Sequence, residues 1–132
     1  GTVRTLTDEN RAMAEKRLHA IASGTALAFD VEAKITWNPG YPVVVNHPEA
    51  VERFLKVARD TFGEERVSDD AVPTMGGEDF AYYGAECPAC FYQLGLIPVG
   101  ETEIPSVHTP LFDFNDDAIE VGVQMMVALA LS

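Results

Sequence analysis

The apolar residues in the first third of the chain change their spacing near residue 30, and this limits what the chain can fold into. Residues 8–28 predict a helix, because Thr7 can cap it and one face carries Ala14, Leu18, Ile21, Ala22 and Thr25. Residues 31–37 instead alternate apolar and polar side chains, which predicts a strand with one covered face. With residues 3–6 and 41–45 as further extended segments, the pattern predicts strand, helix, strand, or half of a small α+β layer.

A break at residues 46–48 predicts a domain boundary and the start of a second helix. Pro48 suits the first position of a helix over residues 48–62, and Gly63 suits its end. The helix carries one apolar stripe, formed by Val51, Phe54, Leu55, Ala58 and Phe62.

A strand over residues 91–94 and a last helix complete the predicted elements. Asn115 is a good N-cap for that helix, and Asp116 and Asp117 fall in its first turn, where the helix dipole favours negative charge.

The charge of the chain excludes several classes of partner. Nine basic and twenty-one acidic residues give a formal charge of -12, which argues against nucleic acid and against an anionic membrane surface. No apolar run is long enough to span a bilayer, and no signal pattern opens the chain, so we expect no membrane partner. Because the sequence begins with Gly1 and not Met, we expect it to be processed or cut from a longer chain.

Cys87 and Cys90 form a Cys-Pro-Ala-Cys motif that fits a redox pair or half of a zinc knuckle. A redox pair would normally open a helix, whereas residues 91–94 read as a strand, and no second pair of ligands matches a zinc knuckle. We therefore expect two small, buried structural thiols in a reduced compartment, and hence a cytoplasmic protein. A redox protein stays the last-ranked alternative.

Two further motifs carry acids. Glu64 and Glu65 could be a catalytic pair, but adjacent acids after a surface helix are normally solvated. The turn at Gly76 and Gly77 lets the backbone approach a ligand closely, and the acids that follow suit a helix N-terminus, where free N–H groups can hold an anion. Glycines also serve turns for steric reasons alone, so this motif by itself is weak evidence.

His108 is the candidate metal ligand. Imidazole is the commonest protein metal ligand, and Thr109-Pro110 favours an extended backbone beside it. The histidine therefore stands on a stiffened loop directly ahead of the last helix. A structural histidine remains the ordinary alternative.

Five segments together resemble a known family. Residues 75–83 match its Gly-x-Glu-Asp-Phe turn, residues 91–95 its Phe-x-x-Leu-Gly strand, and residues 107–116 its His-x-Pro-x-Phe loop. Residues 1–5 and 40–46 are similar to the strand of its lid domain and the exit from that domain. The chain thus resembles the dinuclear-metal amidohydrolases of the aminoacylase and carboxypeptidase type, in the hippurate hydrolase and auxin-conjugate hydrolase branch.

The resemblance implies an α/β fold in two parts. Residues 1–46 would be the C-terminal part of a βαβ lid (dimerisation) domain, and residues 47–132 the C-terminal part of a catalytic α/β domain like that of dinuclear-zinc exopeptidases. Members of the family are longer, and their other metal ligands and catalytic glutamate lie upstream of the segment matched here. No catalytic residue is therefore expected in this chain, and Glu64-Glu65 does not match the family's catalytic pair.

The resemblance also assigns roles to four residues. His108 matches the last ligand of a site for two divalent ions, zinc or manganese, although it is not expected to hold a metal tightly by itself. Arg4 matches an arginine that helps to hold the substrate carboxylate, with a surface salt bridge as the alternative. Gly76 and Gly77 match the turn beside that carboxylate. Glu78 and Asp79 belong to the motif without an assigned role.

The implied activity is hydrolysis of the amide bond of an N-acyl amino acid (hippurate-like) or a small peptide, by a homodimer paired through its lid. The chain alone is expected to be inactive. The competing hypothesis is a non-catalytic dimerisation or interaction module.

Overall fold

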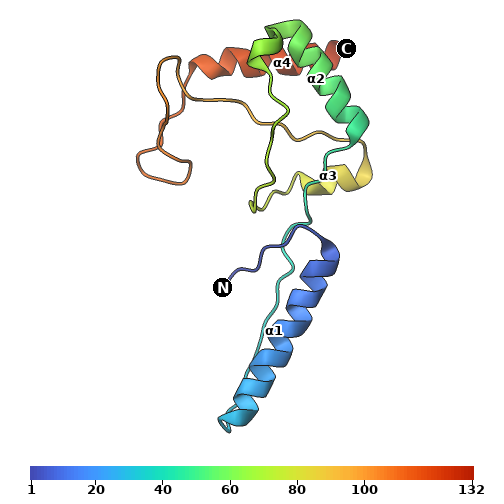
Figure 1. Ribbon diagram of the computed structural model, residues 1–132, viewed down its shortest axis with the longest axis vertical. Helices are drawn as coiled ribbons and strands as arrows, with labels where there is room; N and C mark the ends of the chain where they lie inside the picture. The colour runs from blue at the N-terminus through green and yellow to red at the C-terminus, as the bar shows by residue number, and fades with distance from the viewer. The chain divides into compact units, whose positions relative to one another are not determined.

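A computed structural model describes all residues 1–132 and contains helices but no β-strand (Figure 1). The helices are α1 (Asp8–Ala28), α2 (Pro48–Phe62), the 3₁₀ helix η1 (Glu64–Arg66), α3 (Ala81–Glu86) and α4 (Asp117–Leu131). The chain divides into two compact units, each described by itself below. The first unit is residues 1–46 with 72–88, and the second is residues 47–71 with 89–132.

Helix α1 has the predicted bounds, and its start has the predicted cap. The Thr7 hydroxyl oxygen accepts a hydrogen bond from the Asn10 N–H at 3.1 Å, and Asp8 and Glu9 occupy the first turn. At the other end, the Val31 N–H donates to the Ala26 carbonyl at 3.0 Å, and Ala26 is buried. The half-buried side chains of α1 are a mixture of small, apolar and polar residues, namely Arg11, Ala14, Glu15, Leu18, His19 and Ala22.

The predicted strands are wrong for this chain, and the βαβ layer is not supported. Residues 3–6, 31–37, 41–45 and 91–94 all lie outside regular secondary structure. A strand exists only where a second backbone completes its hydrogen-bond ladder, whereas the period-two pattern reports only that one face is covered. In residues 31–37 that covering is partial, since Ile35 and Trp37 are half-buried while the other side chains are exposed.

In the second unit, α2 and α4 pack against each other, and the segment after Ala89 contributes to their core. The Tyr92 ring stacks on Phe54 of α2 with centroids 4.5 Å apart, and its hydroxyl lies 3.3 Å from the Met126 sulfur of α4. A Cβ atom at Gly122 would lie 3.4 Å from Leu94 Cδ2, so α4 and this segment meet at van der Waals distance. Residues 91–96 alternate between exposed and half-buried, so the period-two pattern is present without a ladder.

Both ends of α2 behave as predicted. The helix begins at Pro48, and Gly63 follows it with φ +91, in the region that favours glycine. Arg53 joins α2 to the end of α4, because its Nη2 donates to the Leu129 carbonyl at 2.8 Å and to the Ser132 carbonyl at 3.0 Å. The free carbonyls of a helix C-terminus are a favourable place for a cation.

The buried core of the chain is small. Four alanines and Met125 are its only buried apolar residues, namely Ala26, Ala58, Ala81, Ala118 and Met125. The accessible surface is 10679 Å², whereas two separate compact bodies sharing 14.4 kDa would expose roughly 8,200 Å² together. Large apolar side chains make up part of this exposed area, including a stripe on α4 formed by Ile119, Val123, Met126, Val127 and Leu131.

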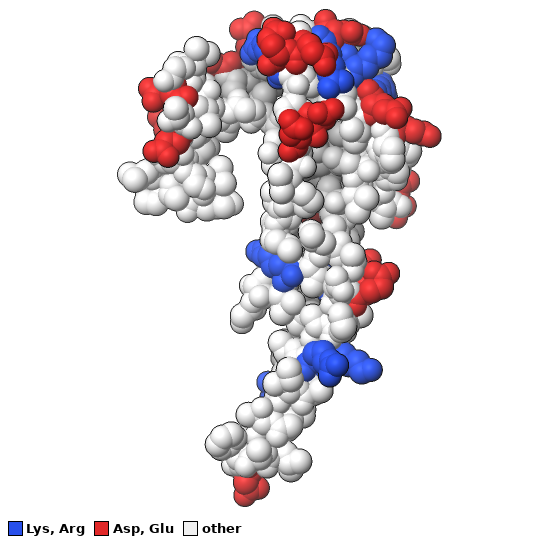
Figure 2. Space-filling model, viewed as in Figure 1, with Lys and Arg blue, Asp and Glu red and all other residues white.

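Charge is distributed unevenly along the sequence. No Lys or Arg occurs after Arg66, while acids continue through the loops to Glu120. Figure 2 shows acidic side chains gathered over the second unit with basic ones among them. No helix is both long enough and apolar enough to cross a membrane.

Candidate functional site

In the first unit, the structure brings Arg4 beside Gly77. A Cβ atom at Gly77 would lie 3.4 Å from Arg4 Nη1 and 3.5 Å from Tyr41 Cδ2. The Gly77 backbone therefore faces both a guanidinium and an aromatic ring at ordinary contact distance. Arg4 is exposed and makes no ion pair or hydrogen bond within the chain, so its donors are available to a ligand. We call Arg4, Tyr41 and Gly77 the Arg4 site.

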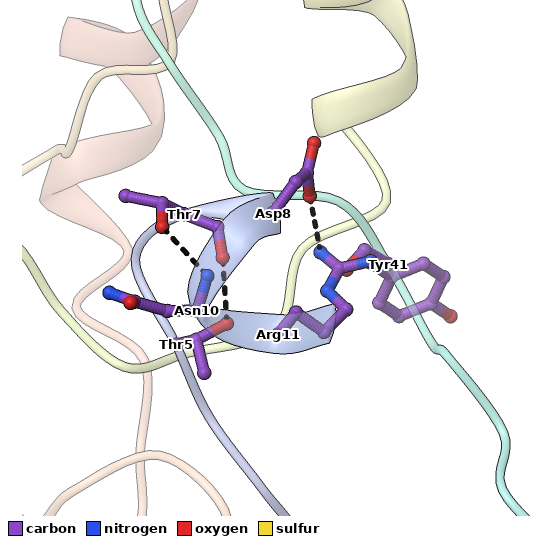
Figure 3. A network of polar contacts seen from close by, with 6 residues as sticks. All are labelled: Thr5, Thr7, Asp8, Asn10, Arg11 and Tyr41. Carbon is purple, nitrogen blue, oxygen red and sulfur yellow. Dashed lines mark hydrogen bonds and ion pairs between the residues drawn. The ribbon is translucent and has the colours of Figure 1, made fainter. Parts of the chain in front are cut away.

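Arg11 of α1 anchors the Tyr41 main chain, as Figure 3 shows. Its Nη2 donates to the Tyr41 carbonyl at 3.0 Å and lies 3.4 Å from an oxygen of Asp8. The Thr7 cap fixes the same turn of α1, and the Thr5 hydroxyl donates to the Thr7 carbonyl at 3.2 Å. The start of α1 and Tyr41 thus form one hydrogen-bonded network next to Arg4.

Tyr82 supplies the other neighbour of Tyr41. Their rings meet edge to face, with centroids 6.2 Å apart and planes at 83°. Tyr82 belongs to α3, and in the turn directly before this helix the Phe80 N–H donates to Glu78 Oε1 at 3.2 Å. This gives Glu78 a structural role, since a carboxylate near a helix start satisfies N–H groups that have no partner inside the helix.

Gly76 lies in the same turn but has fewer neighbours. A Cβ atom there would have only Thr74 Oγ1 close by, at 3.6 Å. The two predicted glycines are therefore not equivalent, because Arg4 lies close to the Cβ position of Gly77 and not to that of Gly76.

His108 belongs to the second unit and is exposed, in the loop ahead of α4. Its φ is +66, in the left-handed region that side chains other than glycine rarely adopt. The turn around it is closed by Thr109 Oγ1 donating to the Ser106 carbonyl at 2.9 Å and by the Phe112 N–H donating to the Thr109 carbonyl at 3.2 Å. Backbone strain of this kind often occurs at functional sites.

The residues of this chain do not form a metal site by themselves. No group of three or more His, Cys, Asp or Glu residues is placed so that it could hold an ion. A catalytic zinc site normally has three protein ligands, and His108 is a single donor. No reaction step can therefore be assigned to a metal held by these residues alone.

The other candidate residues, Glu64 and the two cysteines, show no feature of a catalytic site. Glu64 Oε1 lies 3.0 Å from Arg59 Nε, and an Asp69 oxygen lies 3.4 Å from the same guanidinium. Glu64 therefore belongs to a surface ion-pair network. Cys87 and Cys90 are both free thiols, but Cys87 is exposed and Cys90 is half-buried, so the prediction of two buried thiols is wrong for Cys87. Burial raises the pKa of Cys90, which is opposite to the depressed pKa of a reactive redox thiol.

Sequence reasoning missed Arg11, Tyr41 and Tyr82. Tyr41 follows a Pro-Gly break and Tyr82 follows the glycine turn, and both have mostly apolar neighbours in sequence, so neither was distinguished as a site residue. Arg11 lies one turn after the Thr7 cap, like many surface arginines, and nothing in its local sequence distinguishes it.

Comparison with known proteins defines the family. Residues 4–132 match peptidase family M20/M25/M40, and the chain therefore belongs to this family. It is 33% identical over its full length to the putative amidohydrolase YhaA of Bacillus subtilis, and 33% identical over 98% of its length to a hippurate hydrolase of Campylobacter jejuni. It is also 31% identical over 96% of its length to an N-acetyldiaminopimelate deacetylase of Streptococcus suis.

The chain spans about a third of the length of these relatives, 33% for the first two and 32% for the third. No solved structure matches the chain. The family assignment confirms the resemblance drawn from the sequence motifs, and it supports a hydrolase.

Proposed function

We propose that this chain is part of a metal-dependent amidohydrolase that cleaves the amide bond of N-acyl amino acids, hippurate among them, or of small peptides. Residues 1–46 would belong to the lid domain, and residues 47–132 to the catalytic domain. Matches to a hippurate hydrolase and to a deacetylase of an N-acetyl amino acid support this substrate class.

The observation that carries the proposal is that the Arg4 guanidinium lies close to Gly77, 3.4 Å from its Cβ position. The substrate carboxylate would lie against the Arg4 guanidinium, which can donate two parallel hydrogen bonds to a carboxylate. The Gly76 and Gly77 backbone would approach the same end of the substrate, since neither residue has a side chain that keeps a ligand away.

His108 would supply one ligand to a centre of two divalent ions, zinc or manganese. Such ions polarise the scissile carbonyl and lower the pKa of a bound water. The other metal ligands, and the glutamate that transfers the proton, would come from parts of the whole enzyme that lie outside these 132 residues. The 132-residue chain alone is therefore proposed to be inactive, with a cytoplasmic location and no nucleic-acid or membrane partner.

The test is a titration of hippurate into the chain, followed by nuclear magnetic resonance. The Gly77 amide and the Arg4 side chain should shift in the wild type, and these shifts should be lost in Arg4→Met. Arg17→Met removes an exposed arginine of α1 in the same first unit. It is the matched control and should bind like the wild type. Equal binding by Arg4→Met would contradict the assignment, and turnover of hippurate by the chain with zinc or manganese would contradict its incompleteness.

A second candidate function is dimerisation, favoured by the exposed apolar side chains of α1 and the residues after it, Met13, Ile21, Leu27, Phe29 and Val31. In this hypothesis the first unit would pair with a second copy and carry no substrate. Sedimentation over a range of concentrations would detect a dimer, and Ile21→Lys should weaken it. A monomer at all concentrations would rule this function out for the chain.

A further inference from the structure

We propose that Arg11 is a positioning residue for the Arg4 site, because it fixes the Tyr41 main chain and so holds the Tyr41 ring against Gly77. This rests on the proposed function, since it takes Arg4 and Gly77 to bind the substrate carboxylate. Arg11 itself would not touch the substrate.

First, Arg11 is itself held in place by two partners. Its side chain is 22% exposed and lies between Asp8 Oδ1 and the Tyr41 carbonyl. A guanidinium has donors that point in several fixed directions, so it can serve both acceptors at once. Because Asp8 is in the first turn of α1, Arg11 ties Tyr41 to the most firmly capped part of the helix.

The second step is the effect on Tyr41. This residue lies in an extended segment without a strand ladder, directly after Gly40, whose φ is +64. Such a segment has considerable freedom unless its main chain is held. With its carbonyl fixed by Arg11, the Tyr41 ring packs against the Tyr82 ring and lies close to Gly77.

The third step is the effect on Arg4. Its side chain has no partner within the chain, so its direction is limited only by neighbouring atoms. The Tyr41 ring and the Arg4 guanidinium lie at nearly equal distances from the Gly77 Cβ position, 3.5 and 3.4 Å. Both groups thus lie close to the same point beside Gly77, and in this proposal the ring forms one side of the space in which a carboxylate on Arg4 would sit. Loss of Arg11 should widen that space and weaken binding without removing any group that touches the ligand.

The experiment uses the 132-residue chain with hippurate as the probe. In the wild type, the Tyr41 ring should give a cross-relaxation signal to Gly77. Arg11→Met should lose that signal and lower hippurate affinity by about tenfold, the effect of one lost hydrogen bond. Arg11→Lys keeps a donor for the Tyr41 carbonyl and should recover most of both. Arg17→Met is the control for charge, and α1 helicity by circular dichroism should be the same in all variants.

The outcomes separate the two proposals. If the wild type binds hippurate and Arg11→Met binds it equally well, the positioning role is wrong and the carboxylate site stands. If Arg11→Lys keeps the Tyr41–Gly77 signal and still binds hippurate as weakly as Arg11→Met, the Tyr41 contact is not what matters and the positioning role is again wrong. If the wild type binds no hippurate, the carboxylate site fails and the proposal for Arg11 fails with it.

Discussion

His47 and Ala89 are joined by two hydrogen bonds that run in opposite directions. The His47 N–H donates to the Ala89 carbonyl at 3.0 Å, and the Ala89 N–H donates to His47 Nδ1 at 3.1 Å. Since Nδ1 accepts, the neutral imidazole carries its proton on Nε2. The pair fixes the start of α2 to the segment that packs between α2 and α4.

Removing the acceptor at His47 should destabilise the second unit. His47→Ala leaves the half-buried Ala89 N–H without its partner and should lower the free energy of unfolding by about 1 kcal/mol. His47→Asn is the matched control, because its amide oxygen can take the place of Nδ1 and asparagine is a good N-cap. Urea unfolding measures both, and equal stability of the two variants would show that the side-chain bond contributes nothing.

The positive φ of His108 makes a backbone prediction that is independent of metal binding. His108→Gly should raise the free energy of unfolding by roughly 0.5 kcal/mol, since glycine adopts this region without strain. His108→Val should lower it by about 1 kcal/mol, because a branched side chain clashes there. Asparagine tolerates the region and should stay near the wild type. Chemical unfolding gives the order, and a valine variant as stable as the glycine variant would contradict it.

Gly24 should be a site where a methyl group stabilises the chain. It lies within α1, and a Cβ atom there would have nothing within 4 Å. Gly24→Ala should therefore raise the stability of α1 by about 0.5–1 kcal/mol through helix propensity alone. Gly122→Ala in α4 is the comparison, since its methyl would lie 3.4 Å from Leu94 and part of the gain should be lost. A thermal melt followed at 222 nm decides, and a lower melting temperature for Gly24→Ala would refute the expectation.

The two thiols should differ in reactivity. Cys87 is exposed, whereas burial raises the pKa of Cys90, so Cys90 holds less of the reactive thiolate at pH 8. Iodoacetamide should modify Cys87 first, as measured by mass spectrometry of peptides, and the two rates should converge in urea. Faster modification of Cys90 in the folded chain would contradict this.

The same shift gives a pH dependence with a definite sign. The pKa of Cys90 is higher in the folded chain than in the unfolded one, so the unfolded chain loses its proton first as the pH rises. The contribution of Cys90 to stability is complete below the ordinary thiol range and declines as the pH rises through it. Cys90→Ser should flatten this decline in alkaline unfolding curves.

Local signals predicted the helices but not the pairing of segments. Thr7, Pro48 and Gly63 act on the residues next to them, so the bounds of α1 and α2 could be derived from sequence. The strand predicted over residues 31–37 does not form. A strand depends on pairing with a second backbone, and the local sequence does not show whether that backbone is present. The strand predicted over residues 91–94 is wrong too, because a helix pair and not a sheet covers the inward side chains of residues 91–96.

The candidate site shows the same division. Motif order identified Arg4 and Gly77, which the fold brings together. Arg11 and Tyr41 were missed because their contact joins residues that are distant in sequence, and no local periodicity records such a contact. The roles of Arg4, Gly76, Gly77 and His108 stay predictions.

Nearby residues of α4 differ strongly in how exposed their side chains are. Met125 is 3% exposed and Val127 is 53% exposed, although they lie only two residues apart. In a mutational scan of the isolated chain, truncating the Met125 side chain should lower stability, whereas truncating the Val127 side chain should have little effect. In any longer protein where the outer stripe of α4 is covered, both positions would be constrained, so the tolerance of the isolated chain would overstate how freely α4 can evolve.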